Sequence, residues 1–164
     1  MWRRFRSGAD DFTFAAEGGF YEARVAANAE RVVDLFHALA EHLPPAVDVA
    51  LEDVRSGRRW LGVNVALPDA REAIARLKVP LAAYGGAELA IYSTEDQLTL
   101  TPDLELWIFS RTDRWLYILQ GTGLHEATAL RPESWRFTPD ELGDAPELDE
   151  ALRAAAERLA LEPQ

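Results

Sequence analysis

The sequence predicts a single α+β domain in which helices pack on one face of a mostly antiparallel sheet. Residues 87–121 contain four short apolar runs with brief polar connections between them, which is typical of an antiparallel meander. The earlier predicted strands are also joined in pairs by short turns, and the segments between the pairs carry apolar residues at helical spacing. A length of 164 residues suits one domain. The expected order is β-β-α-β-β-α-β-β-β-β-α, with an acidic C-terminal helix.

The N-terminal part of this order is a strand pair followed by a helix. Phe12–Phe14 and Phe20–Ala27 lie on either side of a turn that contains two adjacent glycines, so they predict a hairpin with an irregular or bulged loop. Asn28 is a suitable N-cap for the helix, which runs to about Leu43 on the spacing of its apolar residues. Two consecutive prolines then end it.

A second strand pair follows the first helix. Val47–Glu52 alternates apolar and polar residues, which predicts a half-buried strand. In the returning strand the same alternation places Leu61, Val63 and Val65 toward the core and Trp60 away from it. The expected core draws on all of the predicted elements: Val32, Phe36, Leu39, Val49, Leu61, Val63, Ile74, Leu77, Leu106, Ile108, Leu116 and Ile118.

The second helix leads into the meander. Asp69 is a suitable cap for this helix, and Pro80 is expected to disrupt it. The four strands expected in the meander are Glu88–Ser93, Gln97–Thr101, Leu104–Ser110 and Trp115–Gln120. The last two of them are apolar on both faces, which predicts a sheet that is covered on both sides.

The chain divides into a core and an acidic extension. We expect an α+β core domain at residues 1–131, with its antiparallel meander at 87–121. The remaining residues, 132–164, predict a helical C-terminal extension that packs on the same domain or projects from it. Helix-capping signals at Thr138–Glu141 and Asp144–Glu147, each with a proline in the first turn, mark its helices.

The last helix is both strongly acidic and narrow on its apolar side. Residues 139–164 carry eight acidic residues against two arginines, a charge of −6 out of the formal net charge of −11. The apolar stripe is Leu148, Leu152, Ala155 and Leu159. Because this stripe is narrow, we expect weak docking, and we expect deletion of residues 144–164 to leave a folded domain.

The composition limits the classes of partner and of chemistry. A net charge of −11 disfavours nucleic acid and membranes as partners, because both are polyanionic, and is compatible with a basic protein. The chain has no cysteine, which excludes disulfides, thiolate metal sites and cysteine nucleophiles. Its basic start lacks the apolar region of a signal peptide, and no apolar run is long enough to span a bilayer. These features favour a cytoplasmic protein.

No catalytic or cofactor-binding motif is present. The sequence lacks a serine nucleophile elbow, a phosphate-binding loop and a dinucleotide fingerprint. His37 and His42 are five residues apart, so they do not share a helix face as metal ligands would. His125 and Glu126, beside a glycine-rich turn, are the best acid/base candidates, although no partner for them is evident. We therefore expect no metal and no cofactor.

Candidates for contact with a partner fall in two segments. The predicted hairpin of the last two meander strands combines tryptophan, tyrosine and arginine, the residue types that dominate protein interfaces. Its candidate residues are Trp107, Arg111, Arg114, Trp115 and Tyr117. In the acidic extension, Glu147 and Glu150 are suited to attract a basic partner by long-range electrostatics.

The function that we favour is a non-catalytic protein-binding module. Such a module would act as an inhibitor, an immunity-type antidote or a chaperone of a basic partner protein. The alternative is a small-molecule-binding domain or a hydrolytic enzyme with a pocket between the sheet and the helices. A deep pocket with convergent polar groups would favour the alternative, whereas a filled core with an exposed aromatic surface would favour the module. The sequence leaves homo-oligomerisation open.

Overall fold

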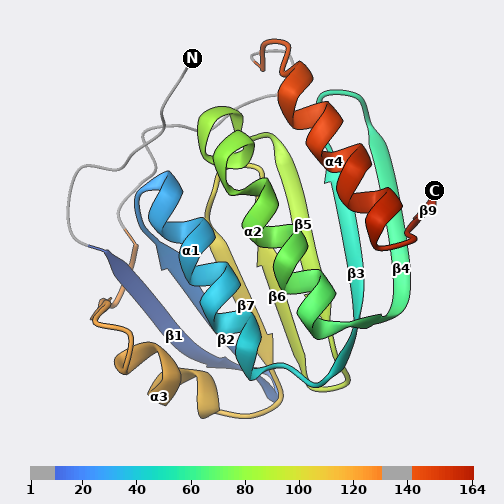
Figure 1. The fold of residues 1–164 in the computed structure, drawn as a ribbon. Helices are drawn as coiled ribbons and strands as arrows, with labels where there is room; N and C mark the ends of the chain where they lie inside the picture. Colours follow the sequence, from blue (N-terminus) through green and yellow to red (C-terminus); the bar gives the residue numbers. More distant parts are fainter. Residues whose placement is uncertain (1–9, 131–141) are drawn as a thin grey trace.

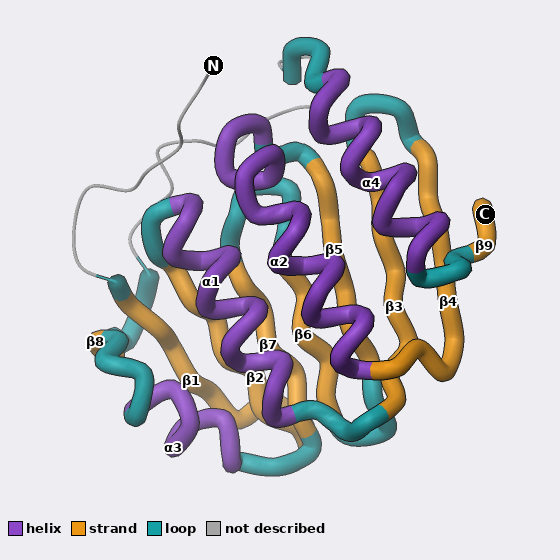
Figure 2. The backbone as a smooth tube through the Cα atoms, viewed as in Figure 1, coloured by secondary structure: helices purple, strands orange, loops and turns teal. Residues whose placement is uncertain are grey.

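Helices cover one face of a single large sheet. The computed structural model describes residues 10–130 and 142–164 (Figure 1). The helices α1 (Ala29–Leu39), α2 (Leu67–Tyr84) and α4 (Pro146–Arg158) lie side by side across the sheet (Figure 1, Figure 2). The shorter α3 (Arg114–Gln120) lies at one corner of the molecule, beside β1 (Figure 1). The predicted α+β class, with helices on one face, is confirmed.

The sheet has nine strands in the described chain, and its pairing is mostly antiparallel. The strands are β1 (Asp11–Glu17), β2 (Phe20–Ala26), β3 (Ala46–Asp53), β4 (Arg58–Ala66), β5 (Ala87–Tyr92), β6 (Asp96–Leu100), β7 (Leu106–Ser110), β8 (His125–Glu126) and β9 (Glu162–Pro163). Their spatial order is β8-β1-β2-β7-β6-β5-β3-β4-β9. The short β8 pairs in parallel with β1. Each edge of the sheet ends in a strand of two residues, which shortens the edge open to another chain.

The β1–β2 hairpin turns on two glycines. Glu17 pairs with Phe20, so Gly18 and Gly19 form a regular two-residue loop and the irregular or bulged loop predicted here is wrong. Their φ angles are 55° and 94°, and two successive positive φ angles suit the turn whose twist matches that of a hairpin. Residues other than glycine, asparagine or aspartate rarely adopt this backbone. The turn places Phe20 at the start of β2 with its side chain exposed.

A bulge interrupts the pairing of β3 with β4. Val47 pairs with Val65, whereas Val49 pairs with Gly62, so β4 contains one more residue than β3 in this interval. The extra residue falls next to Asn64, whose φ of 55° lies in the left-handed region that asparagine tolerates better than most residues. In a regular strand, successive side chains point to opposite faces of the sheet. One extra residue shifts this alternation, so side chains before and after the bulge no longer follow a single pattern.

The bulge makes the predicted orientation of β4 wrong. The Asn64 N–H is donated to Asp48 Oδ1 at 3.0 Å, which fixes the irregular backbone. On the other side of the bulge Trp60 is buried against the helices. Leu61 and Val63, which were expected in the core, are 40% and 72% exposed on the opposite face.

The segment predicted as the fourth strand of the meander, Trp115–Gln120, forms helix α3 instead. Trp115 and Leu119, four residues apart, are both buried, which is helical spacing. The carboxylate of Asp96 accepts a hydrogen bond from Trp115 Nε1 at 2.9 Å and one from Arg114 at 2.6 Å. A short apolar run fits a strand or a helix equally well, and these contacts with β6 select the helix. Leu116 and Ile118 are only partly buried against the core.

Helix α2 differs from its prediction at both ends. It begins at Leu67, before the predicted cap at Asp69, and a proline lies in its first turn, where a missing N–H costs nothing. It also continues through Pro80 to Tyr84. Pro80 removes one hydrogen bond, but the buried side chains of Leu77 and Leu81 hold both halves of the helix against the core.

Helix α4 begins at Pro146, within the predicted signal Asp144–Glu147, but its N-cap is Ala145 rather than Asp144 and no side chain caps it. The helix contributes to the core. Its buried residues are Leu148, Leu152, Ala155 and Ala156, and the helix packs against α2 and β3. The hydroxyl of Tyr84 donates a hydrogen bond to Glu147 at 2.8 Å across the contact between α2 and α4. The narrow apolar stripe predicted weak docking of this helix, whereas in the structure the residues of the stripe are buried against the domain.

The sheet is covered by helices on one face only within the described chain, which corrects the prediction of cover on both sides. We call the face turned away from α1, α2 and α4 the open face. The predicted capping signal at Thr138–Glu141 lies outside the described residues. None of the helices in the described part of the chain is long and apolar enough to span a membrane.

Candidate functional site

The open face carries the largest exposed apolar side chains of the sheet. Alternation along the strands places every second residue on this face, between residues of the core. Phe20 and Leu61 are each 40% exposed, and Val63 is 72% exposed. Together with the half-buried aromatic residues, the apolar members of the face are Phe20, Leu61, Val63, Tyr92, Trp107 and Phe109. A large contiguous apolar patch marks an interaction site, whereas single exposed apolar side chains are common on any surface.

Three aromatic rings form a cluster at the β2–β7 side of the open face. The ring centroids of Phe20 and Phe109 are 6.2 Å apart, and those of Trp107 and Phe109 are 6.0 Å apart. The guanidinium carbon of Arg24 lies 4.4 Å from the centroid of the Trp107 ring. Arg24 Nε donates to the buried carboxylate of Glu105 at 2.7 Å, which holds the guanidinium in place over the ring.

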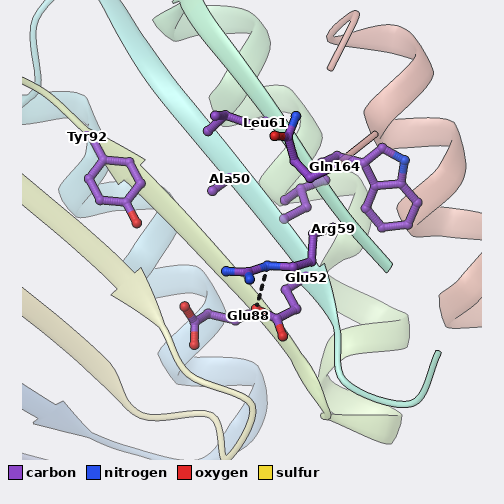
Figure 3. A pocket seen from close by; sticks show the side chains of 9 residues that line it. Ala50, Glu52, Arg59, Leu61, Glu88, Tyr92 and Gln164 are labelled. Atoms are coloured by element: carbon purple, nitrogen blue, oxygen red, sulfur yellow. Dashed lines mark ion pairs between the residues drawn. The ribbon is translucent and has the colours of Figure 1, made fainter. Parts of the chain in front are cut away.

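An acidic hollow lies at the β3–β4–β5 side of the open face. It is a cavity of about 300 Å³. Its lining on the open face consists of Ala50, Glu52, Arg59, Leu61, Glu88 and Tyr92 (Figure 3). Ala50 and its cross-strand partners Leu61 and Ala90 lie in one row, and the alanine side chain leaves room between its larger neighbours. Figure 3 shows the hydroxyl of Tyr92 pointing toward the end of the hollow where Glu88 and Arg59 lie.

The charged groups of the hollow stand in one cross-strand row. Arg59 pairs with Glu52 between β4 and β3, and Glu52 pairs with Glu88 between β3 and β5. The Arg59 Nε is 3.4 Å from the Glu52 carboxylate. Burial, and then the charge of Glu52, raise the pKa of Glu88 above its ordinary value. Burial is also the main cause that raises the pKa of Tyr92.

A second hollow lies on the other side of Tyr92. It is a cavity of about 380 Å³ at the end of the sheet, and its lining includes Asp48, Val63 and Asn64 at the bulge. Tyr92 lines both hollows, so the two form neighbouring depressions in the same face. The bulge therefore shapes the open face as well as exposing Val63.

The charges of the open face are predominantly acidic. From β2 to β4 in sheet order, the face carries the carboxylates Glu22, Asp48, Glu52 and Glu88 and the guanidinium groups Arg24 and Arg59. Both arginines are already paired with carboxylates, Arg24 with the buried Glu105 and Arg59 with Glu52. The remaining negative charge is complementary to a basic ligand.

The space between the sheet and the helices is filled. The cavity bounded there by Phe36, Leu77, Leu89 and their neighbours is about 10 Å³, which leaves no room for a substrate. The described residues also contain no group of three or more histidine and carboxylate side chains placed to hold a metal ion.

The predicted acid/base pair lies at the edge of the sheet. His125 and Glu126 form β8, and His125 Nδ1 is 3.3 Å from the Asp11 carboxylate. Glu126 accepts a hydrogen bond from Gln120 at 3.3 Å. The imidazole and the Glu126 side chain are both exposed rather than enclosed in a cleft, and the contacts that they make fasten β8 to β1 and α3.

The predicted partner-binding residues do not form one surface. Trp107 lies on the open face, whereas Trp115 is buried, so these two tryptophans are not the cross-strand neighbours that a hairpin would have made them. Arg114 is paired with Asp96, while Arg111 and Tyr117 are exposed near α3. Glu147 and Glu150 are exposed on α4, on the helical side of the molecule.

Several residues of the open face were missed by the sequence prediction. Leu61 and Val63 were assigned to the core because the bulge is not visible in the alternation of β4. Glu88 could have been noticed in the sequence. It lies near the start of β5, a strand that is otherwise mostly apolar, and a carboxylate at such a position suggests a functional role. A scan of protein-family models, a search of curated proteins and a search of solved structures each found no match for this chain.

Proposed function

We propose that this protein is a non-catalytic module that binds a basic partner protein through the open face of its sheet. The observation that carries the proposal is the pairing on one face of an aromatic cluster, made by Phe20, Trp107 and Phe109, with an acidic hollow. Aromatic side chains supply apolar contact area, and uncompensated carboxylates select for positive charge in the partner. The activity would be that of an inhibitor, an antidote or a chaperone of the bound protein.

The shape of the molecule favours a protein partner over a substrate. The cavity between the sheet and the helices is about 10 Å³, and the hollows of about 300 and 380 Å³ beside Tyr92 lie on a broad, exposed face. A face of this kind is typical of a surface for another macromolecule. The lack of cysteine in the chain fits a reducing compartment, and the proposal places the protein in the cytoplasm.

A small cationic molecule is the second candidate ligand. The hollow of about 300 Å³ is large enough for an amine of modest size, and Glu88 and Glu52 would neutralise it. The aromatic cluster lies two strands away from Glu88 and would have no role in binding such a molecule. The protein partner accounts for both features, which is why it is the first candidate.

Site-specific photo-crosslinking tests the proposal with a matched control. Val63 and Val79 are both valines, are 72% and 76% exposed, and lie on the open face and on helix α2 respectively. A photoreactive amino acid at position 63 should crosslink a basic protein in extracts of the native host, and the same amino acid at position 79 should not. Equal crosslinking at both positions, or a crosslink at position 79 only, would place the interface away from the open face.

A further inference from the structure

The open face is polarised across its strands. The acidic hollow at β3, β4 and β5 contains Glu88, and the aromatic cluster on β2 and β7 contains Trp107. One strand, β6, separates β5 from β7. At the usual strand spacing, two steps across the sheet correspond to about 10 Å, and Glu88 is two residues, about 7 Å, along β5 from Ala90, which is in the cross-strand row of Trp107. A ligand that uses both ends of the face must therefore present a basic group and an apolar group about 12 Å apart.

At the acidic end, two carboxylates share one guanidinium group. Arg59 forms its ion pair with Glu52, and its attraction lowers the pKa of Glu88 less than burial and the charge of Glu52 raise it, so the hollow keeps a net negative charge. Directly opposed like charges on neighbouring strands are unfavourable, and Glu88 faces Glu52 in this way. A cation beside Glu88 would relieve this repulsion, so charge complementarity points to a positively charged occupant.

The middle of the face is low and neutral. The row that contains Ala50 continues through Ala90 and Thr99 to Trp107. Small side chains in this row place no obstacle between the hollow and the aromatic cluster, and Gln97 is the neighbouring polar group on β6. A continuous segment of a partner could thus lie across β5, β6 and β7 and contact both ends.

We infer that the open face binds an amphipathic segment of a partner protein that places an arginine or lysine in the hollow beside Glu88 and an aromatic or aliphatic side chain against Trp107 and Phe109. This inference rests on the proposed function and specifies the partner's recognition element. On one face of a helix, residues seven or eight apart are separated by about 10.5 to 12 Å, which matches the distance between the Glu88 and Trp107 ends of the face. A second copy of this chain is a poor occupant, because its net charge is −11 and its own open face is acidic.

Peptide probes provide the test. A phage-displayed library of random sixteen-residue peptides is selected on the whole chain. The best binder is then synthesised as pairs of peptides, in which one basic residue at a time is either arginine or its neutral isostere citrulline. Affinities are measured by fluorescence anisotropy for the wild type, Glu88→Gln, Trp107→Ala and the control Glu22→Gln. Glu22 is matched because its carboxylate is also on the open face, opposite Phe109 and outside the hollow.

The inference expects a specific coupling between Glu88 and one basic residue of the peptide. Glu88→Gln should weaken the arginine peptide about tenfold and the citrulline peptide less than about twofold. Trp107→Ala should weaken both peptides to a similar extent, and Glu22→Gln should leave the preference for arginine unchanged. Equal losses with the two peptides, a selection that yields no enrichment in basic residues, or a selection that yields no binder would each overturn the inference.

The outcomes also separate the inference from the function on which it rests. If Trp107→Ala weakens binding but Glu88→Gln does not, the open face is an interface and only the inference fails. If neither variant changes binding, the proposed function fails as well. A dimer in light scattering that Glu88→Gln dissociates would identify a second copy as the occupant and overturn the inference. The sequence has three arginines near its start, Arg3, Arg4 and Arg6. If their replacement by serine tightens peptide binding, this segment of the chain itself is the occupant of the open face, and the inference is overturned.

Discussion

Glu52 and Glu88 are directly paired across β3 and β5, so two carboxylates face each other on the open side of the sheet. Glu52 has Arg59 as its cross-strand neighbour and ion-pair partner on its other side, whereas Arg59 acts on Glu88 only through a weaker electrostatic attraction. Burial and the neighbouring charge raise the pKa of Glu88. A site that is unfavourable in the free protein and favourable in a complex is a common compromise between stability and binding.

The raised pKa of Glu88 predicts how Glu88→Gln changes stability. A carboxyl whose pKa is higher in the folded state holds its proton more tightly there, so stability falls as the pH rises from the ordinary value of 4.5 through the folded value. Glu88→Gln removes this loss. We expect a higher melting temperature than that of the wild type at neutral pH and little difference below pH 4.5. Thermal denaturation at both pH values would measure this, and an equal gain at both would refute the electrostatic cause.

The substitution Val63→Lys should weaken the binding of a basic peptide without harming the fold. Val63 is exposed on the open face, so Val63→Lys should change the free energy of unfolding by less than about 0.5 kcal/mol. The added positive charge should weaken the binding of a basic peptide, and less so at high salt, where the charge is screened. Val79→Lys on α2 is the matched control and should leave affinity unchanged. Similar affinity losses in both variants, measured by anisotropy, would show that net charge rather than the open face is responsible.

The Asp96 carboxylate should be essential for the position of α3. It is nearly fully buried and accepts hydrogen bonds from Ser110, Arg114 and the Trp115 indole. Asp96→Ala leaves these donors without their acceptor and should cost about 2–4 kcal/mol. Chemical denaturation measures the cost. Arg111→Ala, in the exposed turn before α3, should cost less than about 0.5 kcal/mol, and a wild-type midpoint for Asp96→Ala would contradict the role assigned to the carboxylate.

The burial of α4 predicts that this helix is required for stability. Leu152 is fully buried between α4 and the core, so Leu152→Ala should lower the free energy of unfolding by about 2–5 kcal/mol. Leu61→Ala, at a leucine that is 40% exposed, should cost less than about 1 kcal/mol.

Removal of residues 144–164, which contain α4, should unfold the domain, in contrast to the expectation from the narrow apolar stripe of this helix. A truncated protein with native circular dichroism and a cooperative melt would restore that expectation.

The regular elements were predictable where one local signal dominates. The hairpin at Gly18 and Gly19 requires positive φ angles that few other residues supply, and Pro146 marks the first turn of α4. The apolar spacing of α1 likewise identifies its buried side, which includes Val32 and Phe36. In each case the information lies within a few neighbouring residues.

Two predictions failed where a distant contact decides the local structure. The bulge at Asn64 depends on a hydrogen bond to Asp48, sixteen residues earlier, and it reverses the orientation of half of β4. Helix α3 depends on bonds from Arg114 and Trp115 to Asp96 on β6. Neither contact is apparent from periodicity, because alternation assumes a regular strand and a short apolar run suits both kinds of element.

The sequence by itself determined the α+β class and the acidic charge, since these follow from apolar spacing, turn residues and composition. Only the tertiary structure decided which side chains share the open face. Strand order brings β7 and β5 to either side of β6, and register places Glu88 opposite Glu52. Strand order and register arise from the simultaneous packing of all the elements around one core, so the candidate site emerges from contacts between residues that are far apart in the chain.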